Sequence, residues 1–230
     1  MDRAEYRGQP AQPPSRPAAR YRVAHEIPTL QGSLRKLRSP SPMNGLRLGV
    51  DLDGVVADFN QGWISRYNDH FDAALRPDQV VTWDGLVPIT HFCDMEEFWA
   101  WARAGECSVF RELPLYDGAM ETLARLARVH RPVVISSKYD WAIPDTLEWL
   151  AEHRLPAREI HFVWDKTSVD CDVYLEDAPH HLAALARVRS DRVICRMVRP
   201  WNTAVPGTVD VRDWAEFAAV VGDVAAAART

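Results

Sequence analysis

The stretch Leu48-Gly49-Val50-Asp51-Leu52-Asp53-Gly54-Val55-Val56 decides the fold, because a short apolar run ends there in two aspartates and a glycine. The apolar run predicts a buried strand, and side chains two residues apart on a strand point to the same face. Both carboxylates would therefore converge on one point. Two like charges brought together are costly unless a cation or a shared proton compensates them. The stretch thus indicates a divalent metal and phosphoryl chemistry.

Composition limits the class of protein. The chain has 230 residues, of which 47% are hydrophobic, enough for one core and a small second lobe. No apolar run is long enough for a membrane span, and no secretory signal is visible. The four cysteines are widely spaced without a CxxC pair, which argues against a zinc site or a disulfide framework. We therefore predict a cytoplasmic protein that does not bind membranes.

Charge is unevenly distributed along the chain. The whole chain has a net charge of −5. Residues 1–43 carry +5, so residues 44–230 carry −10. A globular part this acidic has no broad basic surface for nucleic acid. We predict that an anionic small molecule is instead bound by a metal and a few local cations. The oligomeric state stays open, with a homodimer as one alternative.

The first 43 residues contain seven of the sixteen prolines and show no sustained period. We predict a disordered Pro- and Arg-rich arm. Two alternatives stay open: a start codon assigned too early, with Met43 as the true start, and an Arg-rich presequence.

From residue 46 onward, apolar strands alternate with amphipathic helices, which predicts a parallel sheet covered by helices. Residues 44–56 and 113–230 form the predicted core, and the aromatic-rich residues 57–112 form a helical cap inserted after the first strand. The expected strands are 46–50, 132–136, 160–164, 173–175 and 192–195; the expected helices are 118–129, 144–153, 179–188 and 214–227.

Polar side chains end four of the predicted strands, in a fixed order. They are Asp51 and Asp53, then Ser136-Ser137-Lys138, then Lys166, then Glu176-Asp177. Ligands of such sheets bind beyond the carboxyl ends of the strands, so these groups are expected to meet. This order resembles the haloacid dehalogenase (HAD) superfamily, whose motifs are an aspartate pair, a Ser or Thr, a Lys and an acidic pair.

Within that superfamily the chain resembles the 5′(3′)-deoxyribonucleotidase family. The matching text is DLDGVVADF at 51–59, FRELPL at 110–115, DKT at 165–167, and the acidic pair followed by Ala178-Pro179. The resemblance covers residues 46–195. It implies a Rossmann-like α/β fold with a small cap, and a phosphatase acting on (deoxy)ribonucleoside 5′- or 3′-monophosphates.

The residues themselves suit phosphoryl transfer, which needs an in-line nucleophile and neutralisation of charge on the phosphoryl oxygens. Asp51 can attack phosphorus and form an aspartyl-phosphate, while Asp53 can protonate the leaving oxygen and then activate water. Mg²⁺ prefers oxygen ligands, and we assign it to Asp51, the Asp53 carbonyl and Asp177. The predicted phosphate-binding residues are Ser136, Ser137 and Lys166.

Two residues depart from the family pattern. Glu176 stands where the family usually has an aspartate, and either a water-mediated role or the orientation of Lys166 would suit it. Lys138 follows the phosphate-binding serines, where it either adds a phosphate contact or lies on the surface.

For substrate binding we predict that Phe59 stacks on a nucleobase, because it follows the aspartate pair as in the family. Trp83 either lines the base pocket or packs in the cap core. Trp63, Trp99 and Trp101 are expected to pack the cap core. The pair His180-His181 is interpreted as a surface pair at a helix N-terminus rather than as metal ligands.

Two alternatives to a nucleotidase remain at this stage. One is a phosphatase for another small phosphoester, such as a sugar phosphate or a biosynthetic intermediate. The other is a non-catalytic binding protein that has kept the fold.

Overall fold

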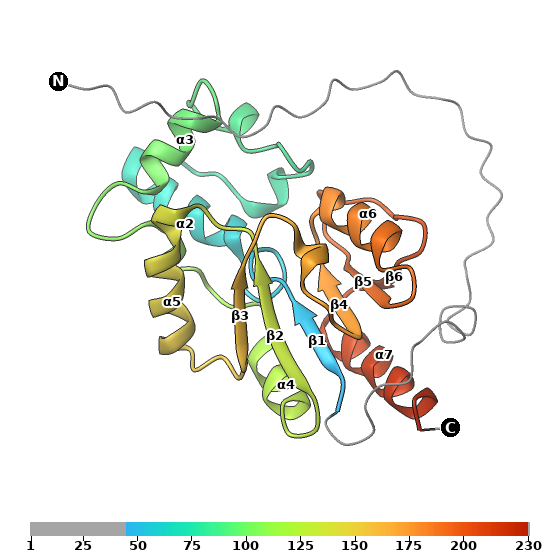
Figure 1. Cartoon of the computed structure of the whole chain (residues 1–230). Helices are drawn as coiled ribbons and strands as arrows, with labels where there is room; N and C mark the ends of the chain where they lie inside the picture. Colours follow the sequence, from blue (N-terminus) through green and yellow to red (C-terminus); the bar gives the residue numbers. More distant parts are fainter. Residues whose placement is uncertain (1–44, 230) are drawn as a thin grey trace, which may run out of the picture.

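The computed structural model describes residues 45–229, so the predicted N-terminal arm lies outside the described residues. Within this range the chain forms a six-stranded parallel sheet in the order β3-β2-β1-β4-β5-β6 (Figure 1). The strands are β1 Arg47–Val50, β2 Arg131–Ser136, β3 Glu159–Phe162, β4 Val173–Glu176, β5 Val193–Met197 and β6 Val209–Val211.

Strand β1 lies near the middle of the sheet, and both of its faces are buried. Leu48 and Val50 on one face and Gly49 on the other are buried, as expected for a strand covered by helices on both sides. Val50 pairs with Val134 of β2 and with Leu175 of β4. This register brings the carboxyl ends of the three strands to the same edge of the sheet. It therefore places the Asp51 turn between the ends of β2 and β4.

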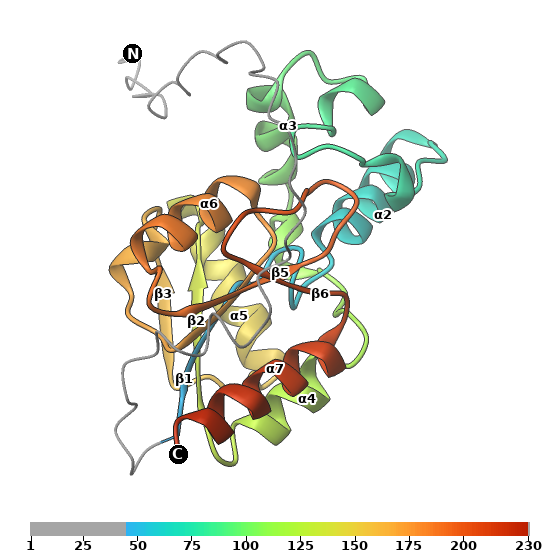
Figure 2. The ribbon, with the colours of Figure 1, turned by 90° about the vertical axis from the view of Figure 1, so that its right-hand side faces the viewer.

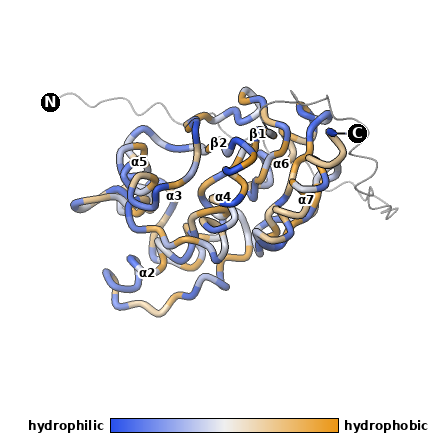
Figure 3. Tube along the Cα trace, turned by 90° about the horizontal axis from the view of Figure 1, so that it is seen from below, coloured by the Kyte–Doolittle hydropathy of each residue, from blue (hydrophilic) through white to orange (hydrophobic). Residues whose placement is uncertain are grey.

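Helices cover both faces of the sheet. Apolar residues of α4 (Ala119–Leu126), α5 (Ile143–Glu152) and α7 (Trp214–Ala227) belong to the larger core cluster, with Val134 and Leu175 of the sheet. Residues of α6 (Pro179–Val188) pack with Val133 and Tyr174, which point to the opposite face. Helices α4 and α7 lie side by side (Figure 2), and hydrophilic and hydrophobic residues alternate along α4 (Figure 3). No helix within residues 45–229 is long and apolar enough to cross a membrane.

The segment predicted to form the cap follows the first strand and is helical. It contains α2 (Phe59–Phe71), α3 (Met95–Ala102) and the 3₁₀ turns Pro77–Gln79, Val87–Ile89 and Val109–Arg111. Figure 1 shows α2 and α3 beyond the arrowheads of the strands. Trp63 and Phe98 are fully buried with their rings edge to face, 5.6 Å apart, which gives the cap an aromatic core.

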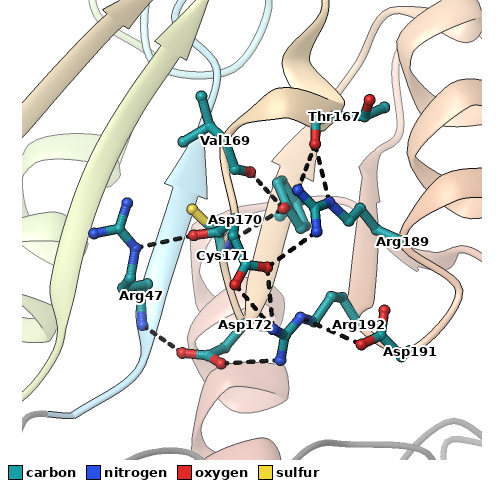
Figure 4. Close-up of polar contacts among 10 residues, drawn as sticks. Arg47, Thr167, Val169, Asp170, Cys171, Asp172, Arg189, Asp191 and Arg192 are labelled. Atoms are coloured by element: carbon teal, nitrogen blue, oxygen red, sulfur yellow. Dashed lines mark hydrogen bonds and ion pairs between the residues drawn. The ribbon is translucent and has the colours of Figure 1, made fainter.

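Ion pairs hold the opposite, amino-terminal edge of the sheet together. Arg47 at the start of β1 donates to the Asp170 carbonyl (2.9 Å), and its main-chain N–H donates to the Asp172 carboxylate (2.8 Å) (Figure 4). Arg192 contacts the carboxylates of Asp170 and Asp172. Arg189 donates twice to the Thr167 carbonyl. This network fixes the segment between β3 and β4, which carries Lys166.

Most of the predicted elements are confirmed to within two residues at each end, with two larger differences. Strand β6 was not predicted; it has three residues, of which Asp210 is exposed, so its apolar pattern is too short to recognise. The predicted helix 118–129 ends earlier, at Leu126, and Val129 lies exposed beyond it.

Candidate active site

The turn that carries the aspartate pair is built by main-chain hydrogen bonds. The N–H groups of Val55, Val56 and Ala57 all donate to the Leu52 carbonyl, at 2.8–3.2 Å. Gly54 has a φ of +76°, which a residue with a side chain rarely adopts. A Cβ at Gly54 would lie 2.1 Å from the Asp177 carboxylate. Glycine is therefore required here both by the turn and by the close approach of the acidic pair.

Lys166 links the first and fourth motifs. Its ammonium is buried and lies 2.9 Å from Asp51 Oδ1 and 2.6 Å from Glu176 Oε2. Burial alone disfavours the ammonium, but these two carboxylates outweigh it and raise the pKa of Lys166. Burial would likewise raise the pKa of Asp51, yet Lys166 holds it below its usual value. Lys166 therefore favours the ionised form of Asp51, which is the form of a carboxylate that can act as a nucleophile.

The contacts of Glu176 explain its position. Its Oε2 accepts from Lys166, and its Oε1 accepts from the main-chain N–H groups of Asp177 (3.1 Å) and Ala178 (3.0 Å). Burial and the nearby Asp51 charge raise its pKa well above the usual value. Of the two roles left open by the sequence, this geometry is that of a group that orients Lys166.

Asp177 supplies the free oxygen of the acidic cluster. The carboxylates of Asp51, Glu176 and Asp177 offer ligand oxygens that all lie within 4.8 Å of one another. Asp177 Oδ1 is buried and has no hydrogen-bond partner within residues 45–229. Burial and the charge of Asp51 raise the pKa of Asp177 to about 7. An orphaned buried oxygen among three carboxylates fits a hard divalent cation such as Mg²⁺.

Asp53 and Lys138 form an ion pair beside this cluster, in which the lysine is buried and the aspartate is partly exposed. Lys138 Nζ lies 2.5 Å from Asp53 Oδ2 and 3.6 Å from the centroid of the Phe110 ring. The lysine is 6% exposed, so the surface alternative for Lys138 is wrong. Burial raises the pKa of Asp53 and lowers that of Lys138. Asp53 Oδ1 has no partner among the described residues and remains available to a bound molecule.

The two predicted serines differ in how they are bonded. Ser136 Oγ lines the cavity, is buried, and has no partner within the described part of the chain. Ser137 Oγ donates to the Val163 carbonyl (2.9 Å) and lies 3.1 Å from His181 Nε2. Its hydroxyl proton is therefore engaged, and the hydroxyl joins β2 to the β3 loop and α6. Only the Ser136 hydroxyl is free to bond an added anion.

The structure confirms the prediction for only one member of the histidine pair. His180 is exposed at the N-terminus of α6, as expected, whereas His181 is buried, and both residues line the cavity. Burial and the charge of Lys166 lower the pKa of His181 to about 3, which keeps the ring neutral. The periodicity of α6 could not reveal the burial of His181, because its ring contacts Ser137, which lies 44 positions earlier in the chain.

A cavity of about 450 Å³ lies above the carboxyl ends of the strands, and of the groups described above all but Glu176 line it. Part of its wall is aromatic, with Phe59 and Phe110 stacked at a centroid distance of 5.5 Å and 20° between their planes. Trp83 is 43% exposed, lines the cavity and meets His180 edge-on, so it is not part of the cap core. Trp63 and Trp101 are buried as predicted, whereas Trp99 also faces the cavity.

The sequence interpretation missed the loop after β5. Arg199 Nε donates to the Gly54 carbonyl (2.7 Å), and Trp201 Nε1 donates to Asp177 Oδ2 (2.8 Å). Asn202 Nδ2 donates to the Asp177 carbonyl (2.8 Å). Trp201 also lines the cavity. The only available signal was a polar and aromatic cluster directly after a strand of the parallel sheet.

Comparison with solved structures identifies the class of fold. A HAD-hydrolase of Bacillus subtilis bound to magnesium superposes with a TM-score of 0.53 at 13% identity, over 77% of this chain and 99% of that one. A haloacid dehalogenase-like hydrolase of Streptococcus pneumoniae gives a TM-score of 0.54 at 12% identity, over 76% and 97%. The fold is therefore that of the HAD superfamily.

Sequence comparison identifies the family. The model of the family described as 5′ nucleotidase, deoxy (pyrimidine), cytosolic type C matches residues 44–229, and the chain belongs to this family. A Clostridium acetobutylicum 5′(3′)-deoxyribonucleotidase is 25% identical over 61% of this chain and 77% of its own length. A Chlorobaculum tepidum protein provisionally named for the same activity is 29% identical, over 66% and 79%. The chain is thus an enzyme of the phosphatase class, which excludes a non-catalytic binding protein.

Proposed function

We propose that this enzyme is a Mg²⁺-dependent nucleotidase that removes phosphate from (deoxy)ribonucleoside 5′- or 3′-monophosphates through an aspartyl-phosphate on Asp51. The observation that carries the proposal is one cavity with two kinds of lining. Asp51, Ser136 and Lys166 are buried polar residues of this lining, and Phe59, Trp83 and Trp99 are aromatic ones. The polar groups suit a phosphoryl group, and the aromatic rings suit the base attached to it.

In this proposal Asp51 attacks phosphorus and the P–O bond to the nucleoside breaks. Asp53 gives a proton to the leaving oxygen, and then takes one from the water that hydrolyses the aspartyl-phosphate. Lys166 and the free Ser136 hydroxyl bond phosphoryl oxygens. The cation would be held by Asp51, the Asp53 carbonyl and Asp177, and when bound it would neutralise charge on the phosphoryl group. Residues 57–112 would act as the cap that selects the substrate.

The test is inorganic phosphate release from a panel of deoxy- and ribonucleoside 5′- and 3′-monophosphates, with Mg²⁺ or with EDTA. The panel also contains deoxyribose 5-phosphate and an aryl phosphate. Metal-dependent turnover of nucleotides above the base-free ester supports the proposal. Turnover of the other esters without turnover of nucleotides would instead indicate a phosphatase for another small phosphoester.

Replacing Phe59 with leucine is expected to lower kcat/KM for nucleotides more than kcat/KM for base-free esters. Stacking of one base on an aromatic ring contributes about 1–3 kcal/mol, so kcat/KM for nucleotides should fall roughly 5- to 150-fold. Deoxyribose 5-phosphate lacks the base and should be turned over as before. The matched control is Phe71→Leu at the other end of α2, outside the cavity. Equal losses for both substrates would remove the stacking role of Phe59.

Replacing Asp177 with asparagine is expected to raise the Mg²⁺ concentration required for half-maximal turnover by at least about 10-fold. The amide keeps the size of the side chain but removes one of the charges that hold a hard cation. Phosphate release is measured across a Mg²⁺ titration. The control is Asp117→Asn, because Asp117 does not line the cavity. An unchanged titration curve for Asp177→Asn would refute its role as a ligand.

A further inference from the structure

The loop after β5 holds Asp177 from two directions. The Trp201 indole N–H donates to the side chain at Oδ2 (2.8 Å). The Asn202 amide donates to the main-chain carbonyl of Asp177 (2.8 Å) and also to the Met197 carbonyl at the end of β5 (2.9 Å). Asp177 is 2% exposed, so solvent does not compete for these bonds. The conformation of Asp177 is therefore set by residues 24 and 25 positions further along the chain.

The two oxygens of Asp177 have unlike surroundings. Oδ2 accepts the Trp201 N–H and lies against Gly54, where an added Cβ would approach it to 2.1 Å. Oδ1 is equally buried but has no partner within residues 45–229. A carboxylate without the indole bond could turn and exchange its oxygens. The indole N–H of Trp201 opposes this rotation, because it bonds Oδ2 and not Oδ1.

The same loop also holds the turn after Asp53. Arg199 Nε donates to the Gly54 carbonyl (2.7 Å), and its guanidinium lies 3.8 Å from the centroid of the Tyr116 ring. Residues 199–202 thus contact both the first and the fourth motif. Their contacts fix the spacing between the aspartate turn and Asp177.

We propose that Trp201 is a positioning residue for the cation site: by holding Oδ2 of Asp177 it leaves Oδ1 as the oxygen offered to a divalent cation. This inference rests on the proposed metal role of Asp177. It adds that the ligand is preorganised as a one-oxygen donor by an indole that does not itself bind the metal. Partners that orient a metal ligand in this way commonly contribute 10- to 100-fold to metal affinity, and we expect the same range here.

The test measures binding of Mn²⁺ alone to the EDTA-stripped full chain, from the electron paramagnetic resonance signal of the free ion. Trp201→Phe keeps an aromatic ring but removes the N–H donor, and it should raise the Mn²⁺ dissociation constant about 10- to 100-fold. Trp164→Phe is the matched control. Trp164 also lines the cavity, but it makes no hydrogen bond to the acidic cluster among the described residues. The Trp164→Phe variant should bind Mn²⁺ with the same affinity as the unaltered protein.

Further readouts separate positioning from a merely structural role. At saturating Mg²⁺, Trp201→Phe should retain the KM for the phosphoester. The thermal stabilisation that Mg²⁺ gives the protein should shrink, since stabilisation follows affinity. Trp201→His, which restores an N–H donor, should bind Mn²⁺ more tightly than Trp201→Phe.

The outcomes distinguish the two proposals. If Trp201→Phe and the unaltered protein bind Mn²⁺ equally, the role of Trp201 is refuted while the metal site stands. If the unaltered protein binds no Mn²⁺, the metal part of the proposed function fails together with this inference. If Trp201→Phe lowers the melting temperature in EDTA but leaves Mn²⁺ affinity and the Mg²⁺ stabilisation unchanged, Trp201 is structural and the inference is overturned.

Discussion

The Asp51→Asn variant is expected to lose at least about 10⁴-fold in kcat while keeping its fold, because a carboxamide does not attack phosphorus. The substitution preserves the shape of the side chain. Lys166 retains its bond to Glu176 at 2.6 Å, so its ammonium is not left without a carboxylate. The loss should appear with every phosphoester that the enzyme turns over. It is measured as inorganic phosphate release at saturating Mg²⁺, with the melting temperature as the check on folding.

The matched control is Asp58→Asn, the same chemical change seven positions further along. Asp58 caps the N-terminus of α2 by accepting from the Gln61 N–H (3.0 Å), and asparagine caps helices equally well. Its activity should therefore equal that of the unaltered protein. Turnover by Asp51→Asn at a normal rate would contradict the role of Asp51 as nucleophile.

The Lys166→Met variant is expected to lose both stability and activity. Lys166 is 3% exposed and lies between Asp51 and Glu176, so its removal leaves two buried carboxylates without their cation. Breaking a buried ion pair from one side costs about 3–5 kcal/mol. The loss of stability should grow as the pH rises from about 5 to 8. At higher pH the two carboxylates ionise in the unfolded chain, whereas burial without a cation disfavours their ionised form in the folded protein. Urea unfolding in EDTA measures this change.

A second variant tests the cause of this loss. Lys166→Met combined with Glu176→Gln removes one of the unpaired charges and should recover part of the stability, but no activity. Arg76→Met is the surface control. It breaks the exposed Arg76–Asp78 pair and should change the free energy of unfolding by less than about 1 kcal/mol. A double variant less stable than the single one would contradict the charge argument.

The fold was predictable where hydrophobic periodicity is long. Helices 179–188 and 214–227 have the bounds expected from their apolar spacing, and β2 differs by a single residue. Strand β6 was not predictable, because its apolar signal consists of Val209 and Val211 alone. It is recognised only by its pairing with β5, a contact between residues far apart in sequence.

The meeting of the candidate site residues was predictable where a motif lies at or beyond the end of a strand. Asp51, Ser136, Lys166 and Asp177 belong to four such motifs, and all four residues line the cavity. The contact of Trp201 with Asp177 was not predictable, because it joins residues 24 positions apart on different loops. Nor could the sequence decide the environment of Lys138. Its burial depends on Phe110 of the cap and on Asp53 of another motif.

The most direct test of the account is to trap the covalent intermediate during turnover. The enzyme is mixed with Mg²⁺ and a nucleoside monophosphate, quenched, and treated with borohydride, which reduces an aspartyl-phosphate to homoserine. Peptide mass spectrometry then determines whether position 51 holds aspartate or homoserine. The account predicts homoserine at position 51 when nucleotide and Mg²⁺ are both present, and aspartate when either is left out. Phosphate release from the nucleotide with Asp51 unmodified under trapping conditions would contradict it.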